Sequence, residues 1–253
     1  MLSYQHAYHA GGPADVHKHF ALAGLLETLL RDPEPLTIVE THAGRALYHL
    51  DSAEAKKTGE AAEGIALTPR SDHPFWPLLD RFREDFGATA YPGSPMIAAG
   101  MLRRRDGQVL FELHPAEHAA LVDAMEGSDA QIQRADGYAG TLALPRADGR
   151  TLVLIDPSYE VKSEYAEMAE FTHRLLARWP DAMVMIWYPI LPAARHEAMR
   201  AALPPHLAQE VRFDLKGGKG MRGSGLAFVN APEWISDVLA SAVAAAPFLR
   251  VRR

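Results

Sequence analysis

The chain has 253 residues, 48% of them hydrophobic and 23% charged, which is the composition of an ordinary globular protein. It has no cysteine, which excludes disulfides and thiolate chemistry, and no apolar run long enough to span a membrane. A net charge of −6 argues against a large nucleic-acid footprint, which is normally basic, although Arg103–Arg105 and Lys216–Arg222 could each form a local basic patch.

The N-terminal segment lacks the charged start and the apolar core of a signal peptide, so we expect a cytoplasmic protein. Gly11, Gly12 and Pro13 predict a loop. The apolar pattern that follows predicts a helix from Ala14 to a point before Pro33.

Four histidines crowd this segment and raise the alternative of a metal site, because neutral imidazole is the commonest metal ligand. They are His6, His9, His17 and His19. No cysteine and no His-Glu-x-x-His helix accompanies them, and two of them flank the glycine loop, so we expect no bound metal.

A first strand is predicted at Leu36–Val39, and it ends in the turn Glu40-Thr41-His42-Ala43-Gly44. An acid followed by a small, glycine-bearing turn at the end of a strand lets a nucleotide-like ligand approach backbone N–H groups. Arg45 stands where a second glycine would be expected. The same turn is therefore also compatible with a plain strand-to-helix connection.

Residues 45–90 are predicted to be a helical insertion within a single domain that spans residues 1–253. Asp51–Gly64 is rich in alanine, glutamate and lysine, and His73–Phe82 predicts a second helix. The acid that ends a second Rossmann strand usually stands about 20 residues after the glycine turn. Here that acid is Glu112, 68 residues after Gly44, so a helical subdomain is expected in the interval.

Acidic side chains are predicted at the ends of several strands, where parallel sheets bind ligands. Glu112, after the strand Gln108–Phe111, could accept both hydroxyls of a ribose, and Asp136, after Ala130–Gln133, could accept from an exocyclic amine. Ser94 could hold a further polar group. Because no GxGxxG phosphate cradle is present, the pattern favours S-adenosylmethionine, which has an adenosine end, a cationic, zwitterionic tail and no pyrophosphate.

The continuous apolar run Thr151–Ile155 predicts a strand buried on both faces of a parallel sheet. Asp156 and Pro157 follow it, so a carboxylate and a free backbone carbonyl could accept the two N–H bonds of a planar amine, on whose ring Tyr159 could stack. Asp156 could also take the proton that the amine loses on methylation. The alternative is an ordinary strand exit in which Asp156 caps the next helix.

Three further strands complete the predicted sheet. Met183–Tyr188 is closed by Pro189, and Val211–Leu215 and Leu226–Asn230 are joined by a glycine-rich segment as an antiparallel edge hairpin. The expected fold is α/β: a Rossmann-like, mostly parallel seven-stranded sheet with that edge hairpin and a helical insertion.

Several motifs resemble those of the bacterial 23S ribosomal RNA adenine-2030 N6-methyltransferases, in the same order along nearly the whole chain. Asp156-Pro157-Ser158-Tyr159 resembles the Asp-Pro-Pro-Tyr motif of adenine-N6 methyltransferases in general. The more specific matches are Met1-Leu2-Ser3-Tyr4, His9-Ala10-Gly11, Ala14-Asp15-Val16, Lys18-His19, Thr41-His42-Ala43-Gly44, Tyr91-Pro92-Gly93-Ser94-Pro95, Glu112-Leu113-His114-Pro115, Ala135-Asp136-Gly137 and Trp187-Tyr188-Pro189.

The resemblance implies a Rossmann-like methyltransferase that uses S-adenosylmethionine, acts on 23S ribosomal RNA and has Asp156 as its catalytic residue. The cofactor contacts that it implies are His19, His42, Ser94, Glu112, Asp136, Gly137 and Asp156. Contacts to the substrate RNA are expected at Tyr4, Lys18, Pro157 and Tyr159. We expect the protein to be a monomer.

The chain departs from the family pattern at three positions. Ser158 replaces a second proline, Glu40 replaces an aspartate, and Arg45 replaces a small residue. A proline at position 158 would stiffen the loop that carries Tyr159, but the chemistry does not require that side chain.

Three alternatives remain open at this point: a catalytically silent RNA-binding protein with this fold, N6-adenine methylation of DNA, and methylation of a protein glutamine. The last is disfavoured, because the protein-glutamine enzymes have Asn where this chain has Asp156.

Overall fold

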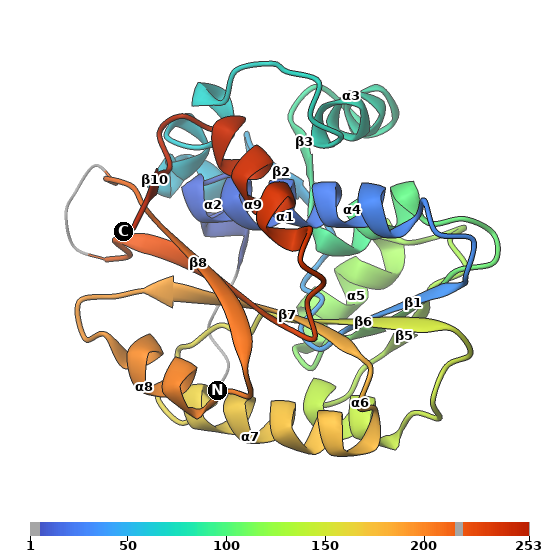
Figure 1. Cartoon of the computed structure of the whole chain (residues 1–253). Coiled ribbons are helices and arrows are strands. Elements are labelled where there is room, and N and C mark those ends of the chain that lie inside the picture. The colour runs from blue at the N-terminus through green and yellow to red at the C-terminus, as the bar shows by residue number, and fades with distance from the viewer. Residues whose placement is uncertain (1–5, 216–219, 253) are drawn as a thin grey trace.

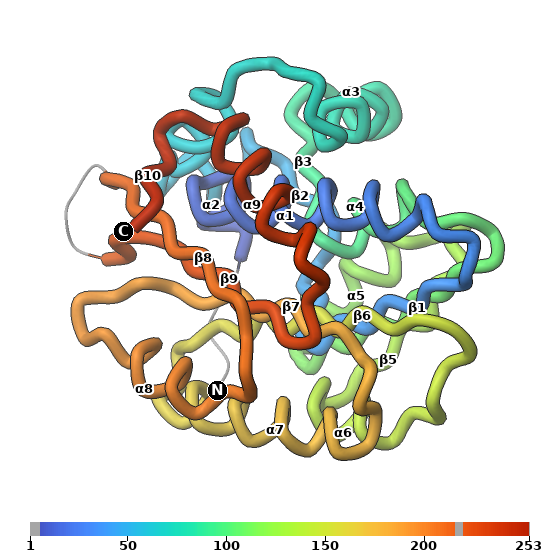
Figure 2. Tube along the Cα trace, in the orientation of Figure 1, coloured from blue at the N-terminus to red at the C-terminus, as the bar shows by residue number. Residues whose placement is uncertain are grey.

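The computed structural model describes residues 6–215 and 220–252. It contains one large mixed sheet with helices on both faces (Figures 1 and 2). Tyr4 and part of the basic stretch Lys216–Arg222 lie outside the described residues. No helix in the described ranges is both long and apolar enough to cross a membrane.

The strands of the large sheet are β1 (Leu36–Glu40), β4 (Gly107–Phe111), β5 (Gln131–Gln133), β6 (Arg150–Ile155), β7 (Met183–Ile190), β8 (His206–Arg212), β9 (Gly223–Val229) and β10 (Arg250–Val251). Their order is β10-β8-β9-β7-β6-β1-β4-β5. Strands β5, β4, β1, β6 and β7 run parallel, whereas β9 is antiparallel to both of its neighbours and β10 is antiparallel to β8. The prediction of a Rossmann-like α/β fold is confirmed.

The helices are α1 (Pro13–Leu29), α2 (Ala53–Thr58), α3 (Phe75–Phe86), α4 (Ser94–Met101), α5 (Pro115–Ala124), α6 (Gly137–Ala143), α7 (Glu164–Arg178), α8 (Arg195–Ala202) and α9 (Ile235–Ala244). Helices α1, α4 and α9 cover one face of the sheet, and α6, α7 and α8 cover the other (Figure 1). The sheet is thus buried on both sides, which is why its central strands are continuous apolar runs.

Strand β6 is central in this arrangement. It pairs in parallel with β1 on one side and with β7 on the other, and its last four residues are buried. The predicted strand at Thr151–Ile155 is therefore confirmed, and Asp156 stands directly beyond its carboxyl end.

Two details of the sheet differ from the prediction. Among the described residues the large sheet has eight strands instead of seven, because Arg250–Val251 adds a short strand beside β8, so the hairpin of β8 and β9 is not at the outer edge. Pro189 does not end β7, which continues to Ile190. Strand β6 is paired with β7 only as far as Ile186, so at Pro189 one side of β7 is unpaired and a missing N–H is tolerated.

The hairpin strands also begin earlier than expected, at His206 instead of Val211 and at Gly223 instead of Leu226. The residues His206–Glu210 are mostly polar or half-buried. They lack the apolar pattern that would have predicted a strand, and they form one because β9 lies beside them.

The chain between β1 and α4 forms a two-stranded antiparallel ribbon and several short helices. These are β2 (Leu47–His49), α2, the 3₁₀ turns η2 (Glu60–Ala62) and η3 (Ile65–Leu67), α3 and β3 (Ala90–Pro92). Gly64 packs directly on the loop before α1, since a Cβ at this position would lie 2.2 Å from the carbonyl oxygen of Gly11. The segment is thereby held against the N-terminal end of α1.

Gly225 in β9 provides a test of the packing. A Cβ at this position would lie 2.0 Å from the ring of the buried Tyr188. We expect Gly225→Ala to lower the free energy of unfolding by about 1–3 kcal/mol, because the ring must move in a filled core. Urea denaturation measures this change.

Gly220→Ala is the matched control, because a Cβ there meets no atom of the described residues within 4 Å. Its stability should equal that of the unsubstituted protein. A Gly225→Ala variant as stable as this control would contradict the described packing of β9 on Tyr188.

Candidate active site

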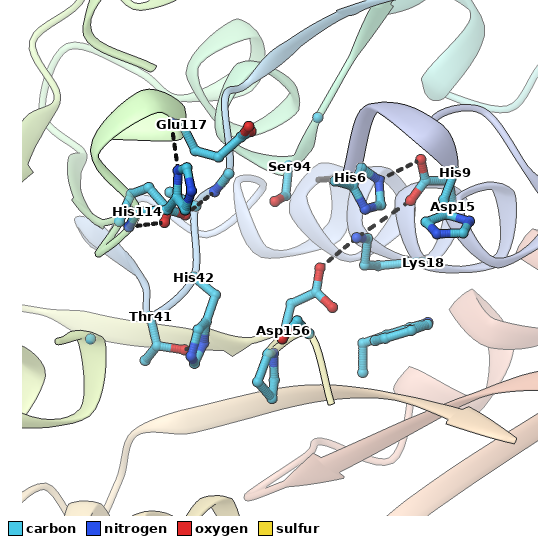
Figure 3. Close-up of a pocket in the computed structure, with 18 of the residues that line it drawn as sticks. His6, His9, Asp15, Lys18, Thr41, His42, Ser94, His114, Glu117 and Asp156 are labelled. Carbon is cyan, nitrogen blue, oxygen red and sulfur yellow. Dashed lines mark hydrogen bonds and ion pairs between the residues drawn. The ribbon is translucent and has the colours of Figure 1, made fainter. Parts of the chain in front are cut away.

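A cavity opens at the carboxyl ends of β1, β4 and β6, beside the N-terminal half of α1 (Figure 3). Its walls include Thr41–Gly44 after β1, Glu112–His114 after β4, Asp156–Ser158 after β6 and Asp136–Tyr138 at the start of α6. The topology therefore brings together acids that are far apart in the sequence, at the edge where parallel sheets bind ligands.

Asp156 faces this cavity and meets Lys18 of α1 there (Figure 3). The Lys18 ammonium donates to Asp156 Oδ2 at 2.5 Å and lies 3.5 Å from Asp15 Oδ1. Burial opposes the charge on Lys18, but the two carboxylates raise the pKa of its ammonium above the ordinary value. The alternative role of Asp156 as a helix cap is not observed, since α7 begins at Glu164 with Ser163 before it.

Asp15 lies on the other side of Lys18 and is almost fully buried. Its Oδ2 accepts from the backbone N–H of Gly11 at 3.0 Å and pairs with His6 Nε2 at 3.0 Å. Burial opposes ionisation, but His6, His19 and Lys18 lower the pKa of Asp15 well below its usual range. A continuous series of paired side chains thus runs from His6 in the N-terminal segment through Asp15 and Lys18 of α1 to Asp156 at the tip of β6.

His19 and His42, which were predicted as cofactor contacts, line the cavity, and both are neutral at neutral pH. His19 is buried and bonded to the hydroxyl of Tyr91 at 3.0 Å, and burial lowers its pKa to about 3. His42 is bonded to the Thr41 hydroxyl at 2.8 Å, and burial lowers its pKa to about 4. Both rings can therefore accept as well as donate hydrogen bonds at neutral pH.

Ser94 lines the cavity and is hydrogen-bonded to a buried acid, Glu40. Its hydroxyl donates to Glu40 Oε2 at 2.6 Å, and Glu40 Oε1 has no hydrogen-bond partner among the described residues. Burial raises the pKa of Glu40 to about 8, and the bond from Ser94 opposes only part of this rise. Glu40 therefore carries a proton at neutral pH.

Glu112 is held rigidly at the end of β4. Its Oε2 accepts from the Gly44 backbone N–H at 2.9 Å, and its Oε1 accepts from that of His114 at 2.7 Å. Burial raises the pKa of this carboxyl, and the two N–H groups oppose the rise. Each oxygen keeps lone-pair capacity for a further donor.

Asp136 and its neighbours form the wall at α6. Asp136 caps this helix by accepting from the Ala139 N–H at 2.8 Å. Gly137 approaches the turn after β1 so closely that a Cβ would lie 1.9 Å from the Thr41 carbonyl oxygen. The Tyr138 hydroxyl is buried without a partner among the described residues, and burial raises its pKa, so it remains a donor.

Pro157 and Tyr159 were both predicted to contact the substrate, but they lie in different surroundings in the structure. Pro157 lines the cavity, but Tyr159 does not. The Tyr159 backbone has a left-handed φ of 56°, and its ring is 7% exposed, with the hydroxyl donating to the Trp187 carbonyl at 2.7 Å. In this structure the ring lies outside the cavity lining, and the stacking of Tyr159 on a substrate stays a prediction.

Several cavity residues were given no site role by the sequence, among them Tyr138, Trp187 and Glu164. Trp187 follows the same rule as the predicted acids, because it lies near the carboxyl end of a parallel strand, β7. That position could have identified it. Tyr138 and Glu164 lie at helix starts and carry no comparable local signal.

Arg45, which departs from the family pattern, has a structural partner. Its guanidinium donates from Nε to Glu117 Oε2 at 2.9 Å and from Nη2 to Oε1 at 2.6 Å. This two-pronged pair fastens the turn after β1 to α5. The turn leads to the short strand β2 instead of the helix considered above, and a side chain reinforces it where a second glycine was expected.

The four N-terminal histidines have different partners, although His6 and His19 both approach Asp15, at 3.0 Å and 3.9 Å. His9 pairs with Glu60, His17 with Ser224 and Gln209, and His19 also with Tyr91. Within residues 6–215 and 220–252, no group of three or more His, Cys, Asp or Glu side chains has the arrangement of a metal site.

Several known proteins are similar to this chain in sequence. The family model of ribosomal RNA large subunit methyltransferase D, RlmJ, matches residues 33–252. Ribosomal RNA large subunit methyltransferase J of Escherichia coli is 34% identical over 249 residues, which cover 92% of this chain and 88% of that protein. The Haemophilus influenzae protein of the same name is 33% identical over 252 residues, with the same coverage.

A solved structure agrees with these matches. The crystal structure of a Legionella pneumophila protein is 30% identical in sequence, has a TM-score of 0.76 and covers 94% of each chain. The match of the family model over most of the chain, together with relatives above 30% identity, shows the family. The chain belongs to the RlmJ family of ribosomal RNA large subunit methyltransferases.

Proposed function

We propose that this protein transfers a methyl group from S-adenosylmethionine to the exocyclic N6 amine of an adenine in 23S ribosomal RNA. The observation that carries the proposal is the carboxylate of Asp156, which lies in the cavity at the tip of β6 and accepts a hydrogen bond from a nitrogen cation. Membership of a ribosomal RNA methyltransferase family supports the class of substrate.

The cavity residues fit S-adenosylmethionine, which supplies an electrophilic methyl group on a sulfonium when bound. Carboxylates around the cavity suit a cationic ligand, and Glu112 keeps lone pairs for ribose hydroxyls. The buried Tyr138 hydroxyl, unpartnered in the described part of the chain, can donate to a bound molecule. The remaining cofactor contacts that we propose are His19, His42, Ser94, Asp136 and Gly137.

The substrate amine would take the place at Asp156 that the Lys18 ammonium holds. An adenine amine is a poor nucleophile, because its lone pair is delocalised into the ring. Hydrogen bonds to Asp156 and to the carbonyl of Pro157 favour a pyramidal nitrogen whose lone pair is free to attack. Asp156 then accepts the proton that leaves the amine.

We further propose that the N-terminal segment contacts the RNA through Tyr4 and Lys18, and that the protein acts as a monomer in the cytoplasm. The position of Lys18 supports a contact close to the target nucleotide, since its ammonium lies in the cavity beside Asp156.

Product analysis tests the proposal directly. Incubation with labelled S-adenosylmethionine and unmodified 23S RNA should place the label in N6-methyladenosine, identified after digestion to nucleosides. Duplex DNA of the same sequence is the comparison substrate and should remain unlabelled. Label in another nucleoside, or in no RNA nucleoside, would contradict the proposal.

Asp156→Ala tests the proton acceptor. We expect the rate of methyl transfer to fall by about 100-fold or more, because a general base is lost. The fold should persist, since Asp15 still pairs with Lys18, and circular dichroism checks this. Asp181→Ala, which removes an exposed carboxylate paired with Arg146, should keep the full rate.

Glu112→Ala tests the cofactor site. Loss of a charged acceptor for the ribose should weaken S-adenosylmethionine binding by about 10- to 100-fold in a calorimetric titration. Glu126→Ala, at an exposed position after α5, should bind the cofactor normally. Unchanged affinity in Glu112→Ala would remove this residue from the cofactor site.

A further inference from the structure

The two basic stretches of the sequence lie at opposite ends of the sheet. Arg103 lies near the amino end of β4, where its guanidinium donates to Asp106 and to the backbone carbonyls of three residues before β1. Since the cavity lies at the carboxyl ends of the parallel strands, this arginine has a structural role away from it. Arg222, the last residue of the stretch Lys216–Arg222, instead directly precedes β9.

The strand directions place a group of arginines on the cavity side of the sheet. Strand β8 runs in the same direction as β6, because β9 is antiparallel to both β8 and β7, and β7 is parallel to β6. Arg212 is the last residue of β8, and Arg250 of β10 lies directly opposite it. Arg222 lies beside them, since its carbonyl accepts from the Phe213 N–H at 3.3 Å. The three arginines therefore gather at the sheet edge that holds Asp156.

These arginines line a groove that continues from the cavity. Three residues line both the groove and the cavity: His9, Glu60 and Met221. Three strand-to-strand steps of about 4.8 Å separate β8 from β6, so Arg212 stands roughly 14 Å from the tip of β6. An RNA strand covers such a distance in a few nucleotides. The groove thus lies where the chain next to a target nucleotide would run.

The acids of the groove are mostly neutralised by neighbours within it. Asp214 pairs with Arg250, and Glu60 pairs with His9 at 2.8 Å. The remaining carboxylate is that of Glu63, next to η2. The carboxylates that have these partners leave other cations of the groove to a ligand.

Two of the arginines are in that position. Arg212 and Arg222 are exposed, and within the described ranges neither pairs with a carboxylate. Arg212 also stands directly opposite Arg250 across the β8–β10 pair, and like charges in that arrangement destabilise a sheet. An anion bound between them would remove this repulsion.

We infer that Arg212 and Arg222 bind the phosphate backbone of the RNA beside the nucleotide whose base is methylated. This inference rests on the proposed RNA substrate and assigns the surface that holds the flanking strand. Guanidinium groups bind phosphate oxygens through paired N–H donors. Such contacts supply affinity and register without reading the bases. A small contact of this kind also reconciles RNA binding with the net charge of −6.

A double substitution tests this surface. Arg212→Ala combined with Arg222→Ala should weaken binding of a fluorescent 23S RNA fragment that contains the target adenine by about 10-fold or more, measured by anisotropy. The slope of log Kd against log salt concentration should fall by about one to two, because two phosphate contacts are lost. The value of kcat at saturating RNA and the calorimetric affinity for S-adenosylmethionine should stay normal, since neither arginine lines the cavity.

Two further double variants separate a phosphate contact from a general effect of charge. Arg104→Ala combined with Arg105→Ala removes the same charge from exposed positions near the amino end of β4, and should bind the fragment with unchanged affinity and salt slope. Arg212→Lys combined with Arg222→Lys keeps both charges, and should therefore keep the salt slope.

The outcomes are distinct. Equal loss of affinity in the two alanine pairs, or an unchanged salt slope in Arg212→Ala with Arg222→Ala, would overturn the assignment of this surface while the proposed methylation stands. A protein that binds the fragment through these arginines but labels no adenine would overturn the proposed methylation and leave the RNA surface in place. Loss of affinity and slope confined to the pair at positions 212 and 222, with normal kcat, supports the inference.

Discussion

The ammonium of Lys18, held between Asp15 and Asp156, is the interaction on which the site depends. Lys18 is 4% exposed, and an unpaired charge at that depth would be strongly unfavourable. Two carboxylates keep it charged, at 3.5 Å and 2.5 Å. Because Asp15 and Lys18 belong to α1 while Asp156 follows β6, the same pairing fixes the helix over the sheet edge and holds the carboxylate in the cavity.

Lys18 also balances the charge of Asp156, so the carboxylate in the cavity is not left unpaired. A substrate amine is neutral, so under the proposed function it would offer Asp156 a hydrogen bond without balancing its charge. Lys18 would keep Asp15, whose Oδ2 is held by the Gly11 N–H and by His6.

Much of the fold and part of the site could be predicted, because the sequence patterns that predict them each lie within a short segment of the chain. The central strands are continuous apolar runs, and an acid after such a run must stand at the ligand edge of a parallel sheet, as Glu112 and Asp156 do. The pairing of Lys18 with Asp156 could not be predicted, since the two residues are 138 positions apart. The same is true of β10, whose two residues form a strand only because β8 lies beside them.

The position of the Tyr159 ring outside the cavity has a more specific cause. A left-handed φ is uncommon for a residue other than glycine, and nothing in the sequence Asp-Pro-Ser-Tyr predicts that Tyr159 adopts one. With Ser158 in place of a proline, the preceding φ is not locked, and the turn is instead secured from its far end by the bond of the Tyr159 hydroxyl to the Trp187 carbonyl. This bond ties the loop that bears Asp156 to the strand that bears Trp187, so a change in either would move the cavity carboxylate relative to the indole.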